Sequence, residues 1–208
     1  MTTKSTSVLA TLAAAIVLAA AAGLASANKL SYSEQAFRIV WSRLTFSESG
    51  GGLPISCPVT LEGSFHARTM TKTLNASVAD IASAAVDNSR CQEGHATILR
   101  GSLPWDVRYA SFSGTLPSIT SVRHFLIGAA FEVEPGLEVR CLAETSESFP
   151  AAGEATREAG GAITSLIPDS QLAIPARGDG CPALGIFAGF GSVFVQGSNE
   201  RRVTLTLI

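Results

Sequence analysis

Basic charge is scarce in this sequence. The chain has three lysines beside twelve arginines, and its 15 basic side chains are outnumbered by 17 acidic ones. Nucleic-acid-binding domains need a basic face, because contacts to the phosphate backbone supply much of their affinity. The formal net charge of −2 therefore predicts no nucleic-acid partner. The preference for arginine, together with abundant alanine and glycine, indicates a GC-rich coding sequence and is typical of an exported bacterial protein.

Motifs for catalysis and cofactor binding are also missing. The sequence contains no G-x-S-x-G segment for a serine nucleophile, and no two of its three histidines have the H-x-H or H-x-x-x-H spacing of metal ligands. We therefore name no catalytic residue, no metal site and no cofactor, and the sequence favours a non-enzymatic role over an enzymatic one. The glycine-rich segment 189–192 leads neither to a lysine nor to a helix. It predicts the close approach of a strand or an aromatic ring, not a phosphate loop.

Only one long hydrophobic run is present, at residues 8–24. It follows Lys4 and precedes the small residues Ala-Ser-Ala at 25–27, which are the three parts of a secretory signal peptide. A membrane anchor needs about 20 strongly apolar residues, whereas this run is short and dominated by alanine. We expect cleavage of residues 1–27, a secreted or extracytoplasmic mature chain, and no transmembrane span after cleavage.

The four cysteines all follow this segment, at Cys57, Cys91, Cys141 and Cys181. An even number of cysteines in an exported chain favours disulfides, and the lack of C-x-x-C spacing disfavours zinc or redox chemistry. Four cysteines allow three connectivities. We predict the sequential one, Cys57–Cys91 and Cys141–Cys181.

Most of the remaining sequence alternates between apolar and polar residues. In the segment 59–68, for example, Val59, Leu61, Phe65 and Ala67 alternate with polar side chains, as in a half-buried antiparallel strand. About nine or ten such segments follow one another, and one short helix is predicted at 74–86 from the helical spacing of its apolar residues. The fold class is therefore mostly β, an antiparallel sandwich or barrel with two disulfides.

Residues 28–208 are long enough for a single exported β domain. Within it, the segment 144–161 is rich in serine, glutamate, alanine and glycine, and Phe149 is its one aromatic residue. Such a composition buries little apolar surface, so it predicts a mobile surface loop.

Three residues are the weak candidates for a ligand site. His124 shares a strand face with Val122 and Leu126, so it is expected to be half-buried. Trp105 and Tyr109 lie on one side of a strand with Val107, where aromatic rings either fill the core or stack on a ligand. The acids Glu132, Glu134 and Glu138 flank a Pro-Gly turn and are interpreted as solvated side chains, not as a glycosidase pair.

These patterns leave the biochemical function open between two hypotheses. The first is an exported, non-enzymatic β domain that binds or structures something at the cell surface or outside, with a cell-envelope or extracellular partner. The second is a secreted hydrolase whose site is assembled from distant strands. Convergent histidine and carboxylate side chains in a cleft would favour the hydrolase. An outer-membrane barrel is disfavoured, because the chain has only two Trp and two Tyr for the aromatic girdles of such proteins.

Overall fold

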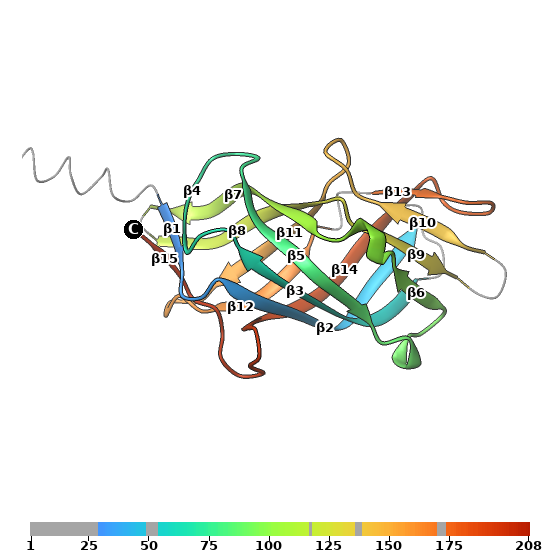
Figure 1. Cartoon of the computed structure of the whole chain (residues 1–208), viewed down its shortest axis with the longest axis horizontal. Helices are drawn as coiled ribbons and strands as arrows, with labels where there is room; N and C mark the ends of the chain where they lie inside the picture. Colours follow the sequence, from blue (N-terminus) through green and yellow to red (C-terminus); the bar gives the residue numbers. More distant parts are fainter. Residues whose placement is uncertain (1–28, 49–53, 117, 136–138, 170–173) are drawn as a thin grey trace, which may run out of the picture.

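The computed structural model describes residues 29–48, 54–116, 118–135, 139–169 and 174–208. The predicted signal peptide at 1–27 lies outside these residues. The predicted fold class is confirmed: the described chain is mostly β, and eight of its strands form a closed antiparallel barrel (Figure 1). The sequence left a sandwich and a barrel open, and the pairing of β12 (Ile163–Pro168) with β14 (Leu184–Val195) closes the barrel.

The barrel wall follows the order β12-β11-β8-β7-β5-β3-β2-β14. Its other six strands are β2 (Ala36–Glu48), β3 (Ile55–Phe65), β5 (Ser77–Val86), β7 (Trp105–Thr115), β8 (Ser118–Ile127) and β11 (Ala151–Arg157). Alternation of side chains places one set inside the barrel and the other outside. Along β3 every second residue is buried, from Ile55 to Phe65. The hydrophobic interior formed by these alternating residues holds the fold together.

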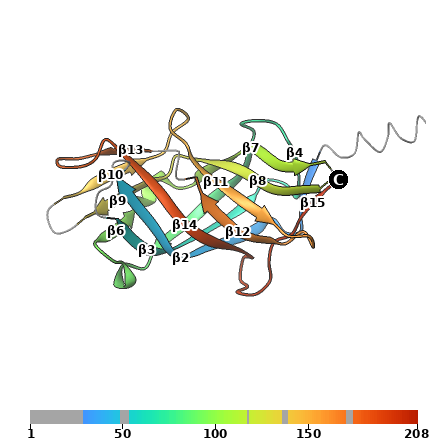
Figure 2. The same cartoon turned by 180° about the vertical axis from the view of Figure 1, so that it is seen from behind.

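Strands outside the wall lie at the two ends of the barrel (Figures 1 and 2). The extension is a four-stranded continuation of the sheet in the order β13-β10-β9-β6. Its strands are β6 (His95–Ile98), β9 (Ala130–Glu134), β10 (Cys141–Glu144) and β13 (Ile174–Arg177). The cap is a separate three-stranded sheet at the opposite end, formed by β1 (Lys29–Tyr32), β4 (Thr69–Thr71) and β15 (Leu205–Leu207). Pairing of β15 with β1 holds the two ends of the described chain together.

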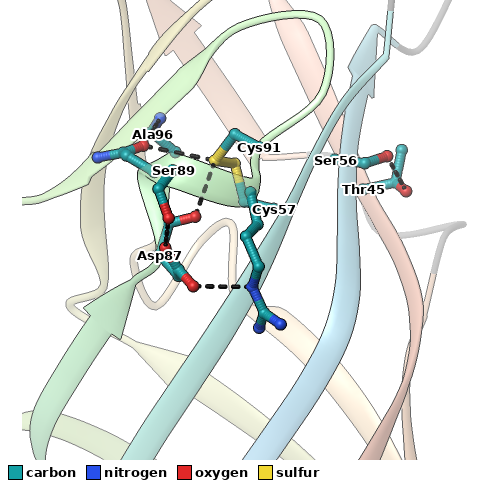
Figure 3. The surroundings of a disulfide bond; sticks show 9 residues. Thr45, Ser56, Cys57, Asp87, Ser89, Cys91 and Ala96 are labelled. Carbon is teal, nitrogen blue, oxygen red and sulfur yellow. Dashed lines mark hydrogen bonds and ion pairs between the residues drawn. A yellow bond between two sulfur atoms is a disulfide. The ribbon is translucent and has the colours of Figure 1, made fainter.

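Both predicted disulfides are present, with the predicted sequential pairing. Cys57 lies in the wall strand β3, and Cys91 follows the 3-10 turn η1 (Asn88–Arg90) that leads toward the extension (Figure 3). Asp87 fixes this turn: it accepts hydrogen bonds from the Ser89 hydroxyl at 2.6 Å and from Arg90 Nε at 2.8 Å. The first disulfide therefore ties the wall to the start of the extension, and Cys141–Cys181 clamps the extension itself.

The predicted helix at 74–86 is wrong. Residues 77–86 form β5, between β3 and β7, and Leu74 is exposed instead of covering a core. The helical part of the described chain consists of η1 and a second 3-10 turn, η2 (Arg100–Ser102). Alanine-rich sequence tolerates either period, and β5 completes two ladders of backbone hydrogen bonds by pairing with a strand on each side.

The predicted mobile loop at 144–161 is also wrong in its central part. Residues 151–157 form the wall strand β11, which pairs with β8 on one side and β12 on the other. Its residue Arg157 donates hydrogen bonds to the carbonyl groups of Leu205 and Ile119. The strand carries almost no hydrophobic signal in the sequence, because the residues that it contributes to the interior are Ala151, Ala152, Gly153 and Ala155.

The glycine-rich segment behaves as the sequence predicts. Gly191 in β14 faces Trp41 in β2, and a Cβ atom at Gly191 would lie 2.5 Å from Cε2 of the Trp41 indole. The indole packs against this backbone, and no acceptor for its Nε1 is found among the described residues. Only glycine leaves room for the ring at this place.

Substituting Gly191→Ala is expected to lower the free energy of unfolding by about 1–3 kcal/mol, because the indole must move or the strands must separate. Gly160→Ala is the matched control, since an added methyl group there meets no atom within 4 Å. Its effect should stay within about 0.5 kcal/mol in the same urea titration. Equal stability of the two variants would show that Trp41 adjusts without cost.

Candidate functional site

The barrel contains an internal cavity of about 200 Å³. All eight wall strands contribute to its lining, and the cap and the extension contribute at the two ends. The lining is almost entirely aliphatic and aromatic, and within the described chain it includes no aspartate, glutamate, lysine or arginine. Ala151, Gly153 and Ala155 of β11 lie on one side of the cavity, so the small residues of this strand leave part of the interior unfilled.

Aromatic side chains line the cavity toward both ends. On the cap side, Tyr32 of β1 stacks on Phe65 with ring centroids 3.8 Å apart. On the extension side, Phe131 of β9 lies 4.9 Å from Phe187 and 6.1 Å from Phe46, measured between ring centroids. Both clusters line the cavity, so a molecule inside it would meet aromatic rings at each end.

His124 and Tyr32 are the titratable side chains that line the cavity among the described residues. His124 lies on β8, and its direct neighbours on the adjoining strands are Tyr109 of β7 and Gly153 of β11. A Cβ atom at Gly153 would lie 3.1 Å from Cδ1 of Leu166, so the glycine accommodates that leucine side chain. Protein atoms surround His124 on all sides, yet its side chain keeps some accessible surface. This surface is consistent with its position in the lining of the cavity.

Tyr32 reaches His124 from the cap. Its hydroxyl oxygen lies 3.4 Å from Nε2 of His124, a long hydrogen bond that links the cap to the barrel wall. Tyr32 and Tyr109 also interact electrostatically. The three side chains thus form a polar cluster, Tyr32, Tyr109 and His124, inside an otherwise apolar interior.

Burial keeps this cluster uncharged. Desolvation lowers the pKa of His124 from 6.5 to about 4, so its imidazole is neutral near pH 7. Desolvation raises the pKa of Tyr32, and the neighbouring Tyr109 raises it further. Burial likewise raises the pKa of Tyr109. The cluster therefore offers hydrogen bonds without charge.

The three predicted site residues are brought together to different degrees. His124 and Trp105 line the cavity, and Tyr109 is buried beside His124. Trp105 is anchored by a hydrogen bond from its Nε1 to the Ser102 hydroxyl at 2.8 Å. Sequence reasoning missed Tyr32, which lies in a short cap strand far from β8 in the chain and carries no signal that connects it with His124.

The other candidate residues lie outside the cavity. His66 is exposed and pairs with Asp80 at 3.0 Å, and His95 is exposed on the extension. Glu132 and Glu134 lie 3.6 and 3.2 Å from the guanidinium of Arg140, as an ion-pair cluster on the extension. Among the described residues, no three histidine, cysteine, aspartate or glutamate side chains gather in a way that could hold a metal ion.

No helix in the described part of the chain has the length and apolar character needed to span a membrane. Comparisons of the chain with models of protein families, with curated proteins and with solved structures give no match. The cavity and its polar cluster are therefore the features of this molecule that bear on its function.

Proposed function

We propose that this chain is an exported, non-enzymatic binding protein that holds a small apolar molecule inside its barrel. The supporting observation is the cavity of about 200 Å³, which is enclosed by eight wall strands and lined without charged side chains. Empty apolar space costs stability, because its lining loses packing contacts. A well-formed apolar pocket with few polar groups is the usual form of a small-molecule site.

The size of the cavity indicates the size of the ligand. An apolar cavity of about 150 Å³ in another protein binds benzene. The larger space here would accept a molecule of about eight to ten non-hydrogen atoms, such as a substituted benzene. The two disulfides are compatible with an oxidising compartment outside the cytoplasm, which supports the export proposed from residues 1–27.

A hydrolase has little support in this geometry. His124 is the histidine of the cavity lining, and its nearest polar partners are tyrosines that remain protonated. A general base needs an orienting partner and access to a polar substrate. No carboxylate lines the cavity in the described residues, so His124 lacks the acid that would complete such a site.

Ethylbenzene is a suitable probe for this proposal, and we expect a dissociation constant on the order of 0.1 mM. Eight carbon atoms transferred from water gain about 6 kcal/mol, part of which is lost on immobilising the molecule. The only two tryptophans, Trp41 and Trp105, both line the cavity, so intrinsic fluorescence should report binding directly. Calorimetry at several temperatures should show a negative heat-capacity change.

A pair of variants on one strand tests the location. Ala155→Leu places an isobutyl group in the cavity and should weaken ethylbenzene binding by at least about tenfold. Thr156→Leu is the matched control. Thr156 is the next residue on β11, its side chain points to the other face of the strand, and it is not part of the cavity lining. Equal affinity of the two variants, with both cooperatively folded, would disprove binding inside the barrel.

A further inference from the structure

The polar groups around the cavity differ in their capacity to bind a ligand. The Thr145 hydroxyl is engaged by Ala129: it accepts from the backbone N–H at 2.8 Å and donates to the carbonyl oxygen at 3.4 Å. The indole Nε1 of Trp105 donates a hydrogen bond to the Ser102 hydroxyl. Nε1 of Trp41 is buried and packs against the backbone at Gly191. Among the described residues of the lining, hydrogen-bonding capacity therefore remains at His124 and Tyr32.

His124 presents one open ring nitrogen. Its Nε2 faces the hydroxyl of Tyr32, while nothing among the described residues hydrogen-bonds to its Nδ1. Nδ1 is not among the buried unpaired atoms, so part of its surface remains accessible, and His124 is one of the residues that line the cavity. Gly153, the direct neighbour of His124 on β11, also lines the cavity. A polar atom beside an apolar cavity gains from a hydrogen-bonding partner, and a ligand group would supply one.

Resting on the proposed binding function, we infer that the ligand carries one uncharged hydrogen-bonding group, a hydroxyl or a carbonyl, that binds Nδ1 of His124. The apolar body of the ligand then occupies the space between the imidazole and the aromatic rings of the extension side. A hydroxyl suits either tautomer of the ring: it donates when Nε2 carries the proton, and it accepts when Nδ1 does.

The same geometry disfavours an anionic ligand. A carboxylate transferred into an apolar interior must be paired with a cation, since its desolvation is otherwise too costly. No lysine or arginine lines the described cavity, and the groups facing His124 are Tyr109 from β7 and Tyr32 from the cap. Burial also keeps the imidazole neutral near pH 7. The site therefore selects for hydrogen bonding without charge.

Three probes of similar size test this selection on the wild-type protein at pH 7.5. We expect 4-ethylphenol to bind at least as tightly as ethylbenzene, and 4-methylbenzoate to bind at least about tenfold more weakly than 4-ethylphenol. Equal or tighter binding of the benzoate would overturn the inference. Failure of ethylbenzene to bind would instead count against the proposed function, so the two ideas fail in different ways.

Variants of His124 then identify the polar contact. His124→Phe should weaken 4-ethylphenol binding by about tenfold and change ethylbenzene binding by less than about twofold, because it removes the nitrogen and retains an aromatic ring. His124→Gln, which restores a hydrogen-bonding side chain, should recover part of the phenol affinity. If the ratio of the 4-ethylphenol affinity to the ethylbenzene affinity is the same in the wild type and in both variants, His124 does not bind the ligand. Thermal unfolding verifies that each variant is folded.

Discussion

Replacing Cys57 and Cys91 together by alanine is expected to lower the free energy of unfolding by about 4 kcal/mol. The bond joins residues separated by 34 positions, and its loss returns conformational entropy to the unfolded chain. Since the total stability of a domain is about 5–15 kcal/mol, this is a large part of it. Urea unfolding of the oxidised protein measures the effect.

Reduction provides the control for this experiment. The second bond, Cys141–Cys181, spans 40 positions and should contribute a similar amount. Reductant should therefore destabilise the double variant by only about 4 kcal/mol, and the wild type by roughly twice that. If the two substitutions lower the free energy of unfolding of the oxidised protein by less than about 1 kcal/mol, the wall and the turn η1 hold their positions without the disulfide.

Acid is expected to destabilise the folded protein through His124. The pKa of this side chain is about 4 in the folded state and 6.5 when it is solvated in the unfolded chain. As the pH falls from 6.5 to 4, the unfolded state therefore takes up a proton that the folded state does not, and stability decreases. The contribution should be absent above pH 7 and reach about 2.5 kcal/mol at pH 4.5.

Comparison with His124→Phe isolates this contribution from the titration of all other groups. Between pH 7.5 and pH 4.5, the wild type should lose about 2.5 kcal/mol more stability than the variant. Tyr32 and Tyr109, which face His124, stay protonated throughout this range because burial raises the pKa of each. Parallel curves for the wild type and His124→Phe would contradict the buried position of the ring.

Local sequence was sufficient for several features of this protein. Alternation of apolar and polar residues predicted the strands of the wall, as in β3, because the side chains of a strand alternate between two faces. The even cysteine count predicted two disulfides, and the structure shows both with the predicted sequential pairing. The same alternation placed His124, Trp105 and Tyr109 on inward positions, where they are found.

Tertiary structure alone decided the rest, above all the cavity. The strands β5 and β11 were mistaken for a helix and a loop, because their alanines and glycines carry little periodic signal and become strands only by pairing with neighbours on both sides. The small inward residues of β11 that conceal the strand in the sequence are also those that leave space inside the barrel. The contact of Tyr32 with His124 joins positions 92 residues apart, and only closure of the barrel and docking of the cap bring them together.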